Sequence, residues 1–263
     1  MLTIKQYLRP QTLDEAYELC QKRTNAVIGG MLWLKMQSRS VNTAIDLCDL
    51  GLDYIQEEVD SFRIGAMVSL RQLEKSPELN AMTQNAFSEA VKHIVGVQFR
   101  NSATIGGSIY GRFGFSDVIT LLQSLDTKVH LHHQGIMSLT EFIQLPKNKR
   151  DILVEIIVPK KAMKVRYLTQ RNTATDFPVV ACAVSCIDGT YRCAVGARPG
   201  TAVLLTDDNK ILADGIAEES AERFGKDIAS RTVFGSNMRG SAEYRKQVCA
   251  VLVRRAVMMM KED

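Results

Sequence analysis

The chain has 263 residues, of which 46% are hydrophobic and 24% are charged, and its formal net charge is +4. This is the composition of a folded globular protein, and so small a charge gives no basis for a nucleic-acid-binding surface. No stretch approaches the roughly 18 apolar residues of a membrane-spanning helix, and the first residues lack the long apolar run of a signal peptide. We therefore expect a cytoplasmic protein with no membrane or nucleic-acid partner.

The first 60 residues alternate between helical and strand signals. Thr12 and Glu15 have capping-box spacing and predict a helix through Cys20. Ala26–Ile28 predicts a short buried strand, Gly29-Gly30 a turn, and residues 31–36 the start of a helix. A strand, a double glycine and a helix N-terminus together favour a phosphate site, because unpaired N–H groups and the positive dipole end point the same way. One such loop alone is weak evidence, and a plain turn between two elements is the alternative.

Several short elements follow before a second glycine-rich stretch. We expect strands over 43–47 and 61–65, a capping box of Ser69 with Gln72, and a helix over 87–95. Residues 100–109 then read Arg-Asn-Ser-Ala-Thr-Ile-Gly-Gly-Ser-Ile, with Gly106 and Gly107 between two hydroxyl side chains. Paired glycines let the backbone approach a ligand closely, and such a loop turns N–H groups toward an anion. A turn without a ligand remains the alternative.

A carboxylate follows the second glycine stretch at the start of an apolar helix. Ser116 is a suitable N-cap for that helix, and Asp117 is its first residue. Glycines that bind an anion, followed by the carboxylate of Asp117, indicate a ligand with both phosphate and hydroxyl groups. A strand over 127–132, a short helix over 139–145 and a buried strand over 152–158 complete this part, and we place the domain boundary at Pro159.

The last hundred residues have a different pattern. Strands over 179–187 and 191–197 are joined by Asp188-Gly189, a strong hairpin signal, and a third strand is expected over 202–205. Helices over about 217–228 and 241–260 follow. Strands followed by helices predict an antiparallel sheet with helices on one face, and no catalytic constellation is present.

Cysteine and histidine spacing excludes other kinds of site. The six cysteines show neither C-x-x-C nor the spacing of secreted disulfides, so we expect no iron–sulfur cluster. His130 and His132 would share one face of a strand, as metal ligands can, but no nearby Cys or carboxylate completes the set. We therefore expect no metal site.

The two glycine stretches and their flanks resemble the FAD-binding subunit of molybdenum hydroxylases, the xanthine dehydrogenase and carbon monoxide dehydrogenase group. The resemblance covers nearly the whole chain. It is carried by residues 27–34, by Arg100-Asn101 leading into Thr-Ile-Gly-Gly-Ser-Ile over 104–109, by Asp117, by 64–73 and by 239–245.

The resemblance implies an α+β fold: a two-part FAD-binding domain of the PCMH (vanillyl-alcohol oxidase-like) type over 1–159, with subdomains of about 1–55 and 56–159. A smaller α+β domain of the CO dehydrogenase flavoprotein type, with an antiparallel sheet and helices, covers 160–263. It also implies FAD as cofactor and no catalytic residue on this chain. The implied cofactor-binding residues are Val27, Ile28, Gly29, Gly30, Met31, Leu32, Trp33, Leu34, Thr104, Ile105, Gly106, Gly107, Ser108 and Asp117.

By the same resemblance, the chain is an oxidoreductase subunit of a heteromeric complex. Electrons would arrive from a molybdenum cofactor subunit through an iron–sulfur subunit and leave to NAD or another acceptor. Met31 and Leu32 replace the polar residues that the family has after its first Gly-Gly, and Thr169 lies near the place of a family lysine. These departures leave one alternative open: a non-catalytic nucleotide-binding or assembly protein that keeps the fold without flavin.

Overall fold

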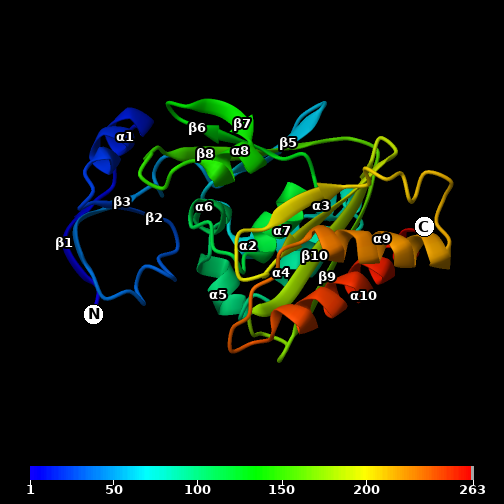
Figure 1. Cartoon of the computed structure of the whole chain (residues 1–263). Helices are drawn as coiled ribbons and strands as arrows, with labels where there is room; N and C mark the ends of the chain where they lie inside the picture. The colour runs from blue at the N-terminus through cyan, green and yellow to red at the C-terminus, as the bar shows by residue number, and fades with distance from the viewer. Residues whose placement is uncertain (262–263) are drawn as a thin grey trace. The chain divides into compact units, whose positions relative to one another are not determined.

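The computed structural model describes residues 1–261, and the chain forms two compact units (Figure 1). Unit 1 comprises Met1–Gln72, Val97–Gly111 and Thr127–Pro159. Unit 2 comprises Leu73–Gly96, Arg112–Asp126 and the chain from Lys160 onward. Both units are therefore assembled from segments that are distant in the sequence.

The first part of unit 1 is a small parallel sheet with one helix. Its strand order is β1 (Thr3–Leu8), β3 (Ser40–Asp46) and β2 (Ala26–Ile28), and α1 (Leu13–Gln21) links β1 to β2. Thr12 caps α1, because its hydroxyl accepts a hydrogen bond from the Glu15 N–H at 3.1 Å. The helix packs its buried face on the sheet through a cluster of apolar side chains: Ala16, Cys20, Ile45, Leu47, Leu52 and Ile152.

The second part of unit 1 is a five-stranded antiparallel sheet. Its order is β4 (Ile55–Glu57), β5 (Ser61–Gly65), β8 (Leu153–Pro159), β6 (Lys128–Leu131) and β7 (Gly135–Ser138). Three short helices accompany it, namely α5 (Val97–Ser102), α6 (Ile105–Tyr110) and α8 (Leu139–Gln144). The Ser69–Gln72 capping box is confirmed at the start of α2 (Leu70–Lys75), with both reciprocal hydrogen bonds formed.

A buried carboxylate joins three strands of this sheet. Glu155 on β8 accepts hydrogen bonds from the Tyr54 hydroxyl at 2.7 Å and from Arg63 on β5 at 2.5 Å, and it contacts Nδ1 of His130 on β6 at 3.0 Å. Burial alone would raise the pKa of Glu155, but these hydrogen bonds outweigh it and leave the pKa below its ordinary value of 4.5.

Unit 2 is a four-stranded antiparallel sheet with helices on both faces. Its order is β12 (Val203–Thr206), β11 (Thr190–Gly196), β10 (Pro178–Ile187) and β9 (Met163–Arg171). One face packs on α9 (Glu218–Arg231) and α10 (Ala242–Lys261), which lie side by side in Figure 1. The other face packs on α7 (Asp117–Gln123), where the Ser185 hydroxyl donates to the Ser124 carbonyl at 2.6 Å. α4 (Ala86–Val91) packs against α7 and β9, and α3 (Pro77–Met82) precedes it.

Most sequence-predicted elements are confirmed within a residue or two, the hairpin at Asp188-Gly189 included. Both turn residues have positive φ, 50° and 78°, as a tight two-residue hairpin requires. The expected helix over 31–36 is wrong: these residues form turns, and Met31 has a φ of 58°, which is incompatible with a right-handed helix. The sequence predicts helices on one face of the C-terminal sheet. In unit 2 the second face of that sheet is also covered, because α4 and α7, which come from earlier in the chain, pack against it. Across residues 1–261, no helix is long and apolar enough to span a bilayer.

Candidate functional site

The two glycine stretches are in direct contact within unit 1. A Cβ atom built on Gly29 would lie 2.6 Å from the Thr104 hydroxyl oxygen. One built on Gly30 would lie 1.7 Å from the Ser102 carbonyl oxygen. Any side chain at either glycine would therefore force the two stretches apart. The first glycine pair lets the loop after β2 lie against the start of α6.

A cavity of about 600 Å³ lies beside this contact, entirely within unit 1. This volume is within the range of small-molecule sites, roughly 300–1,000 Å³. Of the predicted cofactor-binding residues, seven line it: Val27, Ile28, Gly29, Leu34, Thr104, Gly106 and Gly107. The cavity thus brings together segments about 75 residues apart in the chain, and their role in binding a cofactor stays a prediction.

Basic side chains give this cavity its charge. Arg23, Arg39, Lys147 and Arg150 line it, and Asp151 is the one carboxylate among the lining residues. The oxygens of Asp151 already accept hydrogen bonds from backbone N–H groups, including those of residues 133 and 134. The cavity is therefore suited to an anion, and opposite charges of this kind are what hold phosphate groups.

One of these cations is held in place by the first sheet's loop. The Arg150 guanidinium donates from Nη2 to the Asn25 carbonyl oxygen at 2.9 Å, and Asn25 is itself 1% exposed. Sequence analysis missed all four cations, because they are dispersed between positions 23 and 150 and form no motif. Only the fold brings them to one cavity.

The predicted anion-binding N–H groups of the second stretch are already in use. Thr104 is the N-cap of α6, and its hydroxyl accepts from the Gly107 N–H at 3.1 Å. The Ile105 N–H donates to the Val68 carbonyl and the Gly106 N–H to the Ala66 carbonyl, both at 2.9 Å. The expectation that this stretch forms an anion nest is therefore wrong, since helix formation and packing take up those donors.

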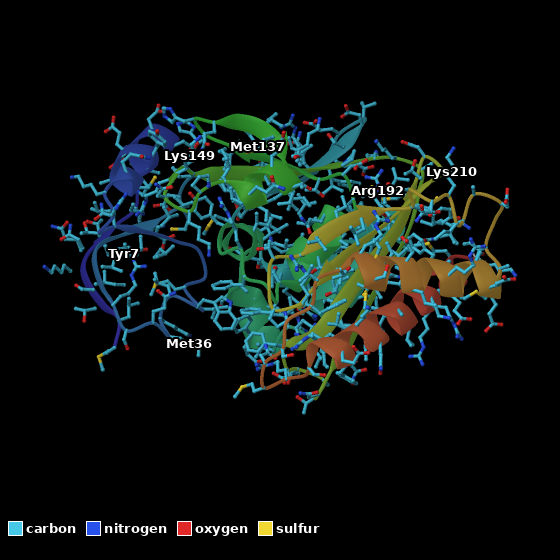
Figure 2. The ribbon with its side chains drawn as sticks, viewed as in Figure 1. Tyr7, Met36, Met137, Lys149, Arg192 and Lys210 are labelled. Atoms are coloured by element: carbon cyan, nitrogen blue, oxygen red, sulfur yellow. The ribbon has the colours of Figure 1, made fainter. Side chains whose placement is uncertain are left out.

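The first loop keeps free donors instead. Within the described chain, the backbone N–H groups of Gly30, Met31 and Leu32 form no hydrogen bond. These three residues and Trp33 do not line the cavity, and Trp33 contacts Phe99 of α5 edge-to-face, with ring centroids 6.3 Å apart. Met36, labelled in Figure 2, is 73% exposed further along this loop. Trp33 thus has a packing contact within unit 1.

Three predicted residues lie outside the cavity lining for other reasons. Ile105 is buried in α6, and the Ser108 hydroxyl donates to the Thr104 carbonyl oxygen at 3.0 Å. Asp117 belongs to unit 2, where Ser116 caps α7 as expected.

The Asp117 carboxylate is part of a buried cluster in unit 2. Its Oδ1 accepts from the Tyr167 hydroxyl and from Nη2 of Arg171, each at 2.5 Å, and the residue is 5% exposed. Burial raises the pKa of Asp117, while the Arg171 guanidinium opposes that shift. Tyr167 and Arg171 both lie on β9, a strand that sequence analysis did not predict. Asp117 thus ties α7 to β9, and its role toward a cofactor stays a prediction.

These features suit a dinucleotide cofactor. The lining combines apolar walls with basic groups, and basic groups pair with a pyrophosphate. Gly29, Thr104, Gly106 and Gly107 would lie against the cofactor, and the basic residues would hold its phosphates.

Comparison with known proteins gives the same cofactor. The family model of the FAD binding domain in molybdopterin dehydrogenase matches residues 3–161, and that of the CO dehydrogenase flavoprotein C-terminal domain matches residues 166–260. The chain is 27% identical over 256 residues to the "Uncharacterized protein YgfM" of Escherichia coli (strain K12), covering 95% of this chain and 94% of that protein.

Two named enzymes are also similar. Identity to the nicotine 6-hydroxylase medium subunit of Paenarthrobacter nicotinovorans is 24% over 270 residues, covering 95% of both chains. A solved structure of carbon monoxide dehydrogenase from Hydrogenophaga pseudoflava superposes with a TM-score of 0.85 at 24% identity, covering 97% of this chain and 98% of that chain. The cavity, the fold and the two family matches lead to one conclusion: the chain belongs to the family of FAD-binding flavoprotein subunits of the molybdenum hydroxylases.

Proposed function

We propose that this protein is the electron-transfer subunit of a heteromeric molybdenum-containing hydroxylase or dehydrogenase. It would receive electrons through an iron–sulfur subunit and pass them to NAD or another acceptor. The observation that carries the proposal is the basic cavity at the contact between the two glycine stretches. The similarity of the chain to a protein named as the medium subunit of a hydroxylase supports a place in a larger complex.

The protein's part in this function is to bind and orient the cofactor. FAD, when bound, supplies the capacity to accept and release electrons, and the chain positions and tunes it. We assign the pyrophosphate to the basic side chains and the close backbone approach to Gly29 and Gly107. No residue on this chain is proposed to act on the substrate of the complex, and a cytoplasmic location remains a prediction.

The cofactor assignment is tested by a visible absorption spectrum and by titration of the purified protein with FAD and FMN. We expect FAD to be retained or taken up, and FMN to bind at least about tenfold more weakly because it lacks the second phosphate and the adenosine. Equal affinities would contradict the role given to the pyrophosphate. Absence of any flavin binding would favour the alternative, a nucleotide-binding or assembly protein.

A matched pair of lysines tests the basic cavity directly. Lys147 lines the cavity, whereas Lys149 is an exposed residue of the same loop that does not (Figure 2). Lys147→Gln should weaken FAD binding by about tenfold, the usual effect of losing one charge-assisted hydrogen bond. Lys149→Gln should leave it unchanged. Equal effects of the two variants would mean that only overall charge matters.

Co-purification from the native host tests the complex. We expect an iron–sulfur protein and a molybdenum protein to accompany the chain. If it is isolated alone and its flavin is reduced only by NAD(P)H, it is a free-standing reductase and the proposed complex is wrong.

A further inference from the structure

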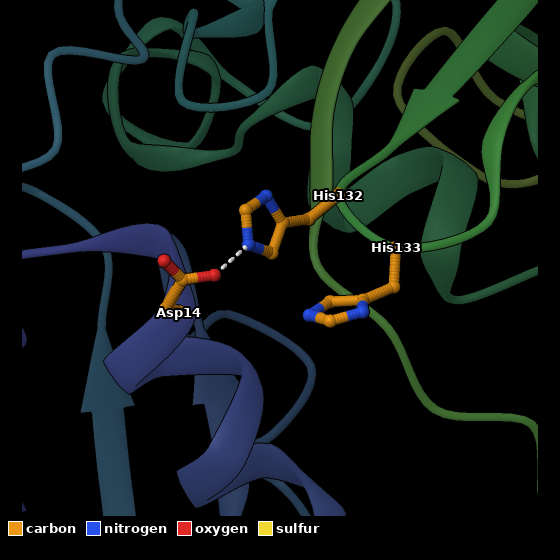
Figure 3. Close-up of side chains that lie close together, drawn as sticks. All are labelled: Asp14, His132 and His133. Atoms are coloured by element: carbon orange, nitrogen blue, oxygen red, sulfur yellow. Dashed lines mark hydrogen bonds and ion pairs between the residues drawn. The ribbon is translucent and has the colours of Figure 1, made fainter.

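Two histidines and one aspartate, none of which lines the cavity, converge on the surface of unit 1 (Figure 3). Asp14 comes from the first turn of α1, and His132 and His133 follow β6. One ligand atom from each residue lies within 4.8 Å of the others, and the His132 Nε2 to Asp14 Oδ1 distance is 2.7 Å. The fold therefore supplies the carboxylate that no residue near the histidines offers in the sequence.

This trio differs from the histidine pair considered in the sequence. His130 and His132 were expected on one face of a strand, but His130 contacts the buried Glu155. His133 takes its place beside His132, with ring centroids 4.9 Å apart, and Asp14 lies 118 positions earlier in the chain.

The histidines are oriented by contacts that do not use their ring nitrogens. The His133 ring stacks on Tyr17 with centroids 3.6 Å apart, and Tyr17 is one helical turn after Asp14. The backbone N–H of His133 donates to the buried Asp151 at 3.2 Å, and that of His132 to the Ile152 carbonyl at 2.9 Å. Such pre-arranged ligands lose little freedom when an ion binds.

We propose that Asp14, His132 and His133 bind a divalent transition metal ion of the zinc class. Two imidazole nitrogens and one carboxylate oxygen are borderline donors that favour Zn²⁺, Co²⁺ or Ni²⁺ over Mg²⁺ and Ca²⁺. Bonds of about 2.0–2.2 Å to a tetrahedral ion place its ligand atoms roughly 3.5 Å apart, so small side-chain rotations suffice. The ion replaces the His132–Asp14 hydrogen bond and leaves one position for water.

A bound ion would link the two sheets of unit 1. Asp14 belongs to the helix that packs on the parallel sheet, and the histidines extend from the antiparallel sheet. The ion would thereby crosslink the two parts of the unit that also supply the cavity. It would stabilise the folded state by mass action, since the unfolded chain lacks the assembled ligand set.

Calorimetric titration of the tag-free, metal-stripped full chain with Zn²⁺ tests the site. A Cys48→Ser background removes the one exposed thiol among the six free cysteines, which would compete for the ion. We expect one equivalent of Zn²⁺ to bind and the thermal midpoint to rise by several degrees, with no response to Mg²⁺.

The variants then decide which residues hold the ion. Asp14 has a side chain that is 79% exposed, so Asp14→Asn should fold normally and weaken Zn²⁺ binding by about tenfold or more. His133→Gln should do the same, whereas His93→Gln in unit 2 is a matched histidine control that should change nothing. Unchanged Zn²⁺ affinity in Asp14→Asn and His133→Gln, or an equal response to Mg²⁺, would overturn the site.

Discussion

Two adjacent glycines of α6 have different neighbours, so alanine at each should have different consequences. A Cβ at Gly106 would lie 2.6 Å from the Ala66 carbonyl oxygen and 2.8 Å from the Ala66 Cβ. A Cβ at Gly107 would meet only the Thr104 hydroxyl oxygen, at 3.1 Å. The pair is a matched comparison because both residues lie in one helix, and both line the cavity.

The expected free energies follow from these distances. At Gly106 the new methyl is roughly 1 Å closer to backbone than the 3.5–4.0 Å of an ordinary contact. Overpacking of that kind costs about 1–3 kcal/mol. Moving apart also weakens the Gly106 N–H to Ala66 carbonyl hydrogen bond, worth about 1 kcal/mol. Alanine in a helix returns about 0.5–1 kcal/mol, so Gly106→Ala should be destabilised by roughly 1–3 kcal/mol.

Gly107→Ala should be close to neutral. It has the same helical gain of about 0.5–1 kcal/mol, which is offset because the Thr104 hydroxyl that must shift is the N-cap of α6. Gly107 and Thr104 both line the cavity, so FAD binding should weaken with little change in stability.

Urea unfolding of the full chain, followed by circular dichroism, measures both variants, and flavin titration measures binding. A lower urea midpoint for Gly106→Ala than for Gly107→Ala is expected. Equal midpoints would refute the inference that Gly106 is required by the backbone at Ala66. Normal FAD affinity in Gly107→Ala would remove that residue from the binding site.

Three further outcomes are expected. Folding lowers the pKa of Glu155, so the ionised carboxylate stabilises the protein above about pH 4.5, and this stabilisation is lost as the pH falls below that value. Glu155→Gln should remove that part of the pH dependence in acid unfolding curves. Asp117→Asn leaves the Arg171 guanidinium without its buried partner and should cost about 3–5 kcal/mol in urea unfolding, whereas Asp176→Asn, at a more exposed ion pair, should change little. FAD affinity should fall as salt is raised from 0.05 to 0.5 M in binding titrations, since the cavity is basic, and a flat response would argue against phosphate pairing.

The features that were predicted well from the sequence are those that depend only on neighbouring residues. The Asp188-Gly189 hairpin, the Ser69–Gln72 capping box and the Ser116 cap depend on neighbouring residues alone, and all are confirmed. The strands β1, β4, β7 and β9 were not predicted. β9 does alternate apolar and polar residues over 163–167 and is followed by a turn at 173–176, so its local signal was present and was missed. In the fold it pairs with β10 along its length and packs against α10.

The glycine stretch at 104–109 shows how packing overrides a local pattern. Two glycines in a row disfavour a helix, yet α6 forms over them because Thr104 caps it and Ala66 and Val68 accept its first N–H groups. The sequence pattern therefore identified segments that line the cavity, but the N–H donors assigned to the second stretch are hydrogen-bonded within the protein. The basic residues that give the cavity its charge lie at positions that no spacing rule connects.

The glycines and the basic residues of the cavity therefore serve different properties of this protein, namely its folding and its ligand binding. Gly30 and Gly106 are required by the close approach of backbone segments of unit 1, and Gly29 by the Thr104 side chain, and those contacts exist with or without a ligand. A chain that kept these glycines and lost its cavity charge would still fold in the same way. Lys147 faces a ligand or solvent, whereas the Arg150 guanidinium also donates to the Asn25 carbonyl oxygen. Substituting Gly29, Gly30 or Gly106 thus tests the fold, and substituting Lys147 tests whether the cavity binds a dinucleotide.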